Sequence, residues 1–241
     1  MCVNLRLMSI AENLAQVRAR IECAARRAHR NTEEVALMAV TKTFPAERIR
    51  EAYAAGQRLF GENRVQEFAE KFDELVDLNA EFHLIGHLQS NKSSRATELF
   101  AAIDSLDSLR LAERLNEAAG KRGRNVPVLI EVNVGGEQQK SGVPPCSREL
   151  EEILQALPRL EHLEMRGLMA VPPLTGDPEG ARPYFRMLRQ IRDDLAGRRL
   201  PRVGLDVLSM GMSHDFEIAI EEGSTCVRVG TAIFGKRPAA Q

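Results

Sequence analysis

The sequence predicts the α/β class, as a single (β/α)8 barrel of the TIM type with an extra amino-terminal helix. Three observations predict it. Short apolar runs alternate strictly with helical patterns, which forces parallel strands joined by right-handed crossovers. Eight such units favour a closed barrel over an open doubly wound sheet. The first strand is followed by AVTKTFP rather than a Gly-rich dinucleotide fingerprint, which counts against a Rossmann fold. We expect residues 1–241 to form one domain, because the barrel uses the whole chain.

The opening element is a helix with a recognisable start. Ser9 followed by Glu12 forms a capping box, and apolar residues then recur at helical spacing to about Arg30. These residues are Ile10, Leu14, Val17 and Ile21. Residues 35–40, VALMAV, come next as a continuous apolar run too short for a buried helix, which is typical of a buried parallel strand.

The same strand, turn and helix unit recurs to the end of the chain. Further strands are predicted at Arg58–Gly61, Phe82–Gly86, Phe100–Ile103, Val126–Val134, Leu163–Met169, Gly204–Ser209 and Cys226–Val229. Helices are predicted between them, notably at Pro45–Ala55, Val65–Leu78, Leu109–Lys121, Arg148–Leu157, Pro178–Ala196 and Met212–Glu222. Only six residues, 236–241, follow Gly235, so the eighth helix must be very short, and we expect the opening helix to fill its place.

The composition excludes several classes of protein. Lys and Arg total 33 against 34 Asp and Glu, so the chain has no net field to attract nucleic acid or an anionic membrane. Its four cysteines lack the spacing of metal ligands, so we expect reduced thiols and neither a zinc site nor disulfides. They are Cys2, Cys23, Cys146 and Cys226. With no signal-peptide core and no apolar run of membrane-spanning length, we expect a cytoplasmic protein, and the lack of heptads favours a monomer.

The carboxyl ends of the strands are where a barrel of this kind carries its chemistry. Lys42 directly follows the first strand, where desolvation would lower the pKa of its amine and free it to attack a carbonyl, forming a Schiff base. The alternative is a lysine that leaves the barrel and extends to water. Lys42 alone does not separate the two.

The last two strands supply a buried cation and an anion site. Arg228 lies within the apolar run CVRVG, where a guanidinium needs either a ligand or a salt bridge. The carboxylates available for that salt bridge lie at other strand ends: Glu62 and Glu131. Gly230 and Thr231 open the closing helix and offer backbone N–H groups to a phosphate. Ser209 of the neighbouring strand can add a hydroxyl to that site, unless it is only a helix cap.

Together these groups fit a ligand with an aldehyde at one end, a phosphate at the other and a ring atom that meets an arginine. Pyridoxal 5'-phosphate (PLP) has that layout. Asn63 is predicted to bond the ring hydroxyl or the ring face. Met169 is predicted to line the ring together with Met210 and Met212, although methionines at strand ends also serve as ordinary core. His83, within the third strand, is predicted to be a hydrogen-bonded core residue and not a catalyst.

Six segments carry a resemblance to a known family: AVTKTFP (39–45), AGQRLFGENRVQE (55–67), FHLIGHLQSNK (82–92), EVNVGGEQQKSG (131–142), RGLMAVPP (166–173) and LSMGMSHDFEIAIEEGSTCVRVGTAIFG (208–235). They resemble the pyridoxal phosphate homeostasis protein family, the YggS/PROSC-type PLP-binding barrel proteins, over nearly the whole chain. The last segment is the most specific, because its Ser, Arg and Gly-Thr spacing matches the family's grip on the cofactor. Thr41 and Phe82 depart from the family's usual residues, but neither touches a proposed contact.

The resemblance implies a site as well as a fold. It implies that Lys42 forms the Schiff base and that Arg228 faces the pyridine nitrogen. It also implies that the phosphate is bound by Ser209, Gly230 and Thr231. The barrel would be the fold-type III arrangement of the amino-terminal domain of alanine racemase, without that enzyme's second β domain. The implied function is intracellular vitamin B6 homeostasis, with apo-enzymes as recipients of PLP.

The same residues favour a carrier over an enzyme. An arginine at the pyridine nitrogen cannot lend a proton, so the ring stays a poor electron sink. A racemase would need an acid and a base on both faces of its substrate, and the only tyrosines, Tyr53 and Tyr184, fall in outer helices. Two alternatives remain open: an amino-acid racemase or lyase that uses PLP, and an aldolase that uses Lys42 without it. No catalytic residue and no metal ligand is predicted.

Overall fold

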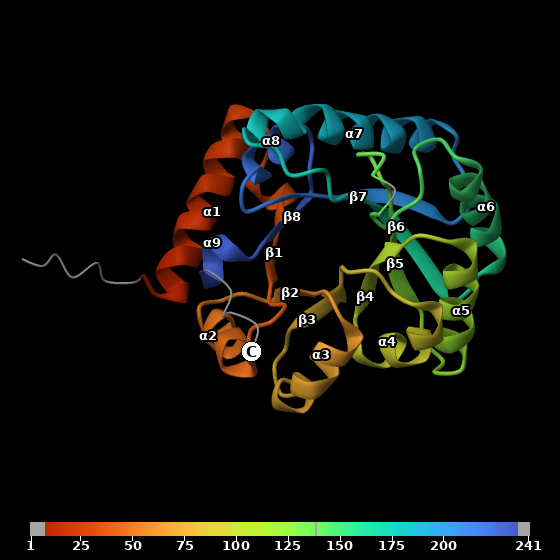
Figure 1. Cartoon of the computed structure of the whole chain (residues 1–241), viewed down its shortest axis with the longest axis horizontal. Helices are drawn as coiled ribbons and strands as arrows, with labels where there is room; N and C mark the ends of the chain where they lie inside the picture. Colours follow the sequence, from red (N-terminus) through yellow and green to blue (C-terminus); the bar gives the residue numbers. More distant parts are fainter. Residues whose placement is uncertain (1–7, 138, 236–241) are drawn as a thin grey trace, which may run out of the picture.

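Eight parallel strands close into a barrel in the computed structural model, which describes residues 8–137 and 139–235. The strands follow one another around the barrel in chain order, and β8 closes the ring by pairing with β1 (Figure 1). Their bounds are β1 Ala36–Val40, β2 Leu59–Glu62, β3 Glu81–Leu84, β4 Ala102–Leu106, β5 Val126–Glu131, β6 Leu163–Met169, β7 Val203–Met212 and β8 Cys226–Val229. The predicted fold class is therefore confirmed.

An α-helix follows each strand, and one more precedes the first (Figure 1). They are α1 Ile10–Arg27, α2 Ala46–Ala54, α3 Val65–Lys71, α4 Ser93–Leu99, α5 Leu109–Gly120, α6 Arg148–Ala156, α7 Arg182–Gly197, α8 Phe216–Glu221 and α9 Thr231–Phe234. The predicted capping box is present, because the Ser9 and Glu12 side chains each accept the other's backbone N–H. Helix α1 packs against α8 and α9, so it covers the side of the barrel that the four-residue α9 leaves open, as predicted.

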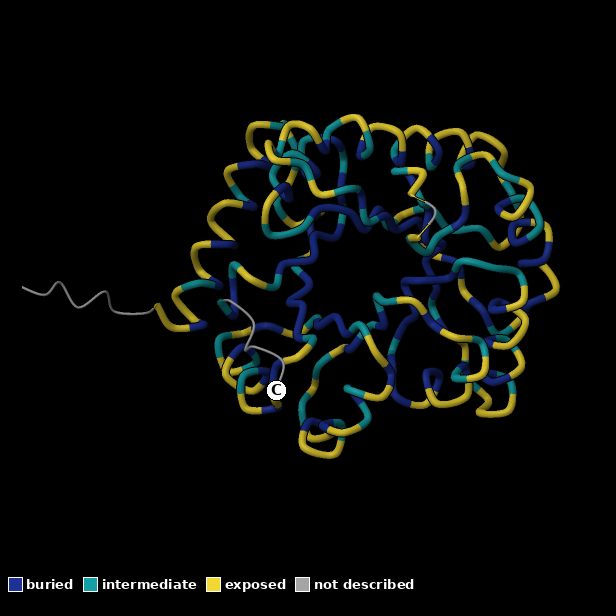
Figure 2. The backbone as a smooth tube through the Cα atoms, in the orientation of Figure 1, coloured by how far each residue is buried: buried dark blue, intermediate teal, exposed yellow. Residues whose placement is uncertain are grey.

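Apolar packing joins the ring of strands to the ring of helices. The strands form the buried inner ring, and the helices alternate buried and exposed residues around it (Figure 2). An aromatic cluster fills the layer outside β2 and β3, where the Phe68 ring of α3 lies 4.8 Å from both Phe82 and Phe100. Phe82 stacks in turn on Phe60 at 5.2 Å. Each such pair contributes about 0.5–1.5 kcal/mol beyond the burial of its apolar surface.

Strands β6 and β8 coincide with their predicted bounds, but β4 does not. The prediction placed it at Phe100–Ile103, whereas the strand is Ala102–Leu106. The prediction left out Asp104 and Ser105, which are polar, and polar residues rarely continue a buried strand. Here both are buried and both have partners. Asp104 binds His83 of β3, so this histidine is hydrogen-bonded as predicted, although it is half-buried rather than part of the core. Ser105 Oγ donates to a backbone carbonyl at 2.7 Å.

Other predicted elements also differed at an end: the helix expected at Val65–Leu78 stops at Lys71, and the strand expected at Phe82–Gly86 is Glu81–Leu84. Strand β5 was expected to reach Val134 but ends at Glu131, because Val132 instead bridges to Val143 of the following loop. The turn after β7 differs more. A helix was expected at 212–222, but β7 continues to residue 212, and α8 begins only at residue 216. The carboxylate of Asp215 accepts the N–H of residue 212 at 2.7 Å and closes a turn between the two elements.

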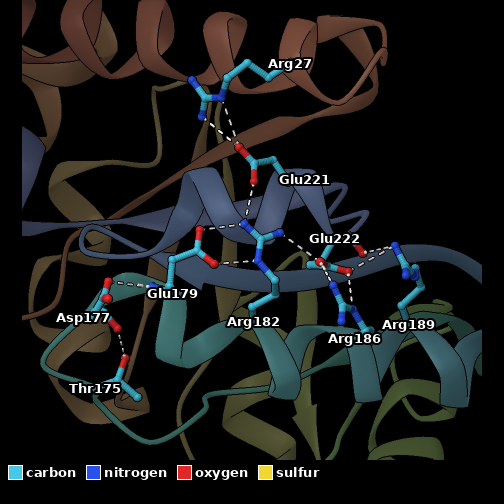
Figure 3. A network of polar contacts seen from close by, with 9 residues as sticks. All are labelled: Arg27, Thr175, Asp177, Glu179, Arg182, Arg186, Arg189, Glu221 and Glu222. Atoms are coloured by element: carbon cyan, nitrogen blue, oxygen red, sulfur yellow. Dashed lines mark hydrogen bonds and ion pairs between the residues drawn. The ribbon is translucent and has the colours of Figure 1, made fainter.

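An ionic network ties α8 to α7 and α1 (Figure 3). Glu222 follows α8, has a side chain only 5% exposed, and lies within hydrogen-bonding reach of three guanidinium groups of α7. These belong to Arg182, Arg186 and Arg189. Glu221 lies 2.8 Å from Arg182 and 3.0 Å from Arg27 of α1. The network therefore fixes the helix that follows the turn at residues 213–215.

Within residues 8–137 and 139–235, no helix combines the length and the apolarity needed to cross a membrane. Nor does any group of His, Cys, Asp and Glu in those ranges suit a metal ion. Cys23, Cys146 and Cys226 are free thiols, and Cys2 lies outside the described residues.

Candidate functional site

The ends of β1 and β8 lie side by side and bring two parts of the predicted site together. Met38 pairs with Arg228 across the two strands. Beyond them, Gly230 packs so closely on β1 that a Cβ added there would lie 3.3 Å from the Val40 carbonyl oxygen. Lys42 follows two residues after Val40 and is half-buried. Lys42 and the turn at Gly230 therefore leave neighbouring strands at the same rim of the barrel.

Lys42 lies in a tight turn with a strained backbone. The Phe44 N–H closes the turn by donating to the Thr41 carbonyl oxygen at 3.1 Å. Thr43 has a φ of 65°, in the left-handed region that β-branched residues rarely adopt. Strain of this kind costs about 1–3 kcal/mol and persists only where surrounding contacts hold it.

Lys71, the last residue of α3, supplies such contacts. Its Nζ donates to the carbonyl oxygens of Thr41 at 3.1 Å and Phe44 at 3.0 Å, one on each side of the turn. The same Nζ lies 2.7 Å from Oε1 of Glu62, which also accepts from the Thr41 hydroxyl. Burial raises the pKa of Glu62, and the charges and hydrogen bonds of Lys71 and Thr41 oppose that rise. The lysine turn therefore rests on a buried ion pair.

Arg228 is a buried cation whose hydrogen bonds go to neutral acceptors. Its Nη1 donates to Ser209 Oγ at 2.6 Å, and its Nη2 donates to the Ala170 carbonyl oxygen at 2.8 Å. Burial lowers the pKa of the guanidinium, and nearby acidic groups oppose that shift. A guanidinium does not deprotonate in proteins, so the site keeps a permanent positive charge.

The two carboxylates considered as salt-bridge partners of Arg228 bind other groups. Glu62 pairs with Lys71, and Glu131 Oε1 accepts from Ser141 Oγ at 3.1 Å. Glu131 Oε2 is buried and has no hydrogen-bond partner in the part of the chain that the structure describes. Burial raises the pKa of Glu131, and the Ser141 hydroxyl opposes that rise. Arg228 therefore has only neutral hydrogen-bond partners, and Glu131 Oε2 has no partner among the described residues. Both groups can still bind a polar ligand.

Ser213, rather than Ser209, contacts the turn that opens α9. Ser213 Oγ accepts from the N–H of Gly230 at 3.2 Å and from that of Ala232 at 3.4 Å. The Ser209 hydroxyl is fully buried and instead accepts from Arg228. The reason is the length of β7, which continues past Ser209 and leaves that residue inside the barrel wall.

The remaining predicted residues also follow or end strands. Asn63 comes directly after β2 and is half-buried. Gly86 packs on its backbone, since a Cβ at that glycine would lie 2.3 Å from the Asn63 carbonyl oxygen. Met169 ends β6, is fully buried, and pairs in register with Ser209 of β7. Thr231 is the first residue of α9.

Sequence reasoning missed two residues of this site, and each had a usable signal. Lys71 places a charge on the apolar face that Phe68 and Phe72 mark in the helical pattern, and a lysine there needs a partner. Ser213 is the second serine of the segment SMGMS and stands just ahead of Asp215, a combination that favours a turn.

Comparisons with known proteins show which family this chain resembles. Residues 12–238 match the family model described as alanine racemase, N-terminal domain. A pyridoxal phosphate homeostasis protein of Aquifex aeolicus is 47% identical over 230 residues, which cover 95% of this chain and 99% of the relative. A protein of the same name from Escherichia coli K12 is 47% identical over 231 residues, which cover 95% of this chain and 97% of the relative.

Solved structures give the same picture. The structure of PipY of Synechococcus elongatus with PLP bound is 40% identical, with a TM-score of 0.79, and the match covers 94% of this chain and 100% of that one. An alanine racemase of Clostridium difficile matches with a TM-score of 0.71 at 14% identity, over 96% of this chain and 57% of that one. The racemase shows a likeness of fold alone.

Proposed function

This chain belongs to the pyridoxal phosphate homeostasis protein family, and we propose that it holds PLP covalently on Lys42 and carries or buffers it. One observation carries the proposal. A lysine in a strained turn, a buried arginine and a turn whose backbone N–H groups meet the Ser213 hydroxyl lie where β1, β7 and β8 end. Lys42 lies far from Arg228 and Gly230 in the chain, and the pairing of β1 with β8 supports a single site for the three.

The groups present suit the three parts of PLP. The cofactor supplies an aldehyde that an amine captures reversibly, a phosphate and a pyridine ring. Lys42 would hold the aldehyde carbon, and Arg228 would face the ring nitrogen. The backbone N–H groups of Gly230 and Thr231 would hold the phosphate, with the Ser213 hydroxyl beside them.

Three further residues complete the proposed site. Ser209 enters it through Arg228, because its Oγ accepts from Nη1 and so fixes the direction of the guanidinium. Asn63 and Met169 would border the ring from the ends of β2 and β6.

We propose a carrier or buffer rather than an efficient enzyme. The permanent charge of Arg228 makes it a poor proton donor to the ring nitrogen, so the ring would stabilise a carbanion weakly. Tyr53 and Tyr184, the only tyrosines, lie in the outer helices α2 and α7. A PLP-dependent amino-acid racemase or lyase is the alternative function.

The proposal extends to the context of the protein. The family match over residues 12–238 supports one domain across residues 1–241. The free thiols of Cys23, Cys146 and Cys226 support a reducing compartment, and so a cytoplasmic location. Apo forms of PLP-dependent enzymes would be the recipients, and the carrier would act as a monomer.

Borohydride reduction followed by peptide mass spectrometry tests the Lys42 assignment. Protein incubated with PLP is expected to develop a new absorption band, and reduction is expected to fix the adduct on the Lys42 peptide. Lys42→Ala should lose both the band and the adduct. Lys121→Ala, which removes a lysine with a 70% exposed side chain, should keep both. A band and an adduct that survive in Lys42→Ala would overturn the assignment.

Deuterium uptake at Cα separates the carrier from an enzyme. Protein loaded with PLP is incubated in deuterated water with single L-amino acids, and exchange is expected to be no faster than with free PLP. Exchange well above that rate would support a racemase. Protein that takes up no PLP at all would instead support the cofactor-free aldolase.

A further inference from the structure

We propose that the buried pair of Lys71 and Glu62 positions Lys42 for the capture of PLP, by clamping both ends of the turn that carries it. The inference rests on the proposed function of Lys42 and names residues that act on it through the backbone. Lys71 and Glu62 are positioning residues in this scheme, since their contacts are with the turn and with each other.

The contacts of Lys71 span the turn. An ammonium group has three N–H donors, and Nζ has three acceptors here: the carbonyl oxygens of Thr41 and Phe44 and the carboxylate of Glu62. The two carbonyl groups flank Lys42 and Thr43 on either side. One side chain of α3 thereby holds the backbone on both sides of Lys42.

The other side of the same turn is tied to the phosphate end of the proposed site. The Phe44 ring lies 5.0 Å from the ring of Phe234 in α9. Helix α9 is the element whose first N–H groups meet Ser213. The clamp therefore sets the position of Lys42 relative to α9, and this separation must match the length of one cofactor.

Stability alone does not account for this pair. Taking a lysine and a glutamate out of water costs several kcal/mol per ion, and apolar residues of similar volume often replace such pairs with no loss of stability. Glu62 is fully buried, and its Oε2 has no hydrogen-bond partner among the described residues, which adds to the cost. The pair does, however, hold Thr43 at a φ of 65°, which an apolar side chain cannot do through hydrogen bonds.

Competitive acetylation of the protein without PLP is the direct test. The rate at which acetic anhydride modifies Lys42 is measured by peptide mass spectrometry, with the exposed Lys121 as internal standard. In Lys71→Met the turn loses the two hydrogen bonds from Nζ to the carbonyl oxygens of Thr41 and Phe44. The side chain of Lys42 should then become more mobile and more accessible to solvent. We expect its relative rate of acetylation to rise by about threefold or more, the scale of a released rotamer constraint.

The affinity for PLP, read from the absorption band, gives the second measurement. Lys71→Met is expected to weaken binding roughly tenfold, because a displaced amine no longer reaches its partner in the productive geometry. Glu62→Gln keeps the shape of the carboxylate and both carbonyl contacts of Lys71, so a smaller change in the same direction is expected. This second variant keeps the inference testable if Lys71→Met fails to fold.

Leu115→Ala is the matched control. Leu115 is fully buried in α5, remote from the Lys42 turn, and its truncation should lower the melting temperature through a cavity. It should leave the acetylation of Lys42 and the affinity for PLP unchanged. Equal changes in Leu115→Ala and Lys71→Met, or wild-type values in both Lys71→Met and Glu62→Gln, would overturn the positioning role. Failure of the proposed function would look different, because wild-type protein would then carry no adduct on Lys42.

Discussion

At the scale of single residues, each buried polar group takes its role from its nearest partner. Ser209 and Ser213 are four positions apart on one segment, yet the first accepts from the guanidinium of Arg228 and the second from the backbone of Gly230. A hydroxyl offers one donor and two acceptor sites, so either serine has capacity left for a ligand. Only Ser213 lies beside the N–H groups proposed to bind phosphate.

Ser213→Ala should weaken the binding of PLP without weakening that of pyridoxal, which has the aldehyde and ring but no phosphate. One lost hydrogen bond to a charged group is worth about 1.5–3 kcal/mol, or roughly a tenfold to hundredfold loss of affinity. Ser209→Ala should affect both ligands alike, because it releases Arg228 rather than the phosphate. Titration of each variant with each ligand measures these affinities. If Ser209→Ala weakened only PLP and Ser213→Ala weakened both ligands alike, the phosphate would be assigned to Ser209.

At the scale of elements, the helix after the Ser213 turn is too short to hold itself. Isolated helices of few residues are unstable in water, and α8 has six residues. Its stability comes from its neighbours: most of its apolar side chains are buried, and the ionic network ties it to α7 and α1 (Figure 3). Burial would raise the pKa of Glu222, but hydrogen bonds from Arg186 and Arg182 lower it below the usual value.

Glu222→Gln is expected to lower the free energy of unfolding by about 1–3 kcal/mol at pH 7, since three arginines lose their charged partner. Glu152→Gln is the matched control, because that carboxylate is 42% exposed and pairs with the single Arg148. Its effect should stay within about 0.5 kcal/mol. Urea denaturation of both variants measures the difference, and equal effects would show that the network adds nothing beyond an ordinary surface pair.

At the scale of the whole molecule, the two ends of the barrel differ in chemistry. The carboxyl ends of the strands carry Lys42, Arg228 and the turn at Gly230. The amino ends enclose a cavity of about 450 Å³ lined in part by His83 and Asp104. His83 Nδ1 lies 3.2 Å from Asp104 Oδ1. Burial alone would lower the pKa of His83, but the charges and hydrogen bonds of nearby carboxylates, chiefly Asp104, raise it to about 9.

This pair should make the stability of the barrel depend on pH. The pKa of His83 is higher in the folded state than its value of about 6.5 in the unfolded chain. The contribution of His83 to the free energy of unfolding is therefore complete below pH 6.5 and is lost as the pH rises through about 9. Between these limits the wild type should lose up to about 3 kcal/mol of unfolding free energy that His83→Gln does not lose. Urea denaturation across this pH range measures both proteins, and parallel curves would contradict the assignment.

Much of the fold could be predicted because its signals are local. Continuous apolar runs marked strands, as at Ala36–Val40, and helical spacing with a capping box marked α1. Errors arose where a distant partner changes what a residue can do. Asp104 continues a buried strand because the side chain of His83 in β3 pairs with it, and residue 212 stays in β7 because Asp215 turns the chain.

The sequence by itself determined the alternation that closes the barrel, the family, and the placement of Lys42, Arg228 and Gly230 at strand ends. Periodicity and strand polarity suffice for these, since both are read along the chain. Only the tertiary structure decided that Ser213 reaches the Gly230 turn and that Lys71 and Glu62 hold the turn of Lys42. Hydrogen bonds depend on distances of about 3 Å between atoms, and such distances between residues far apart in sequence exist only after the barrel has closed.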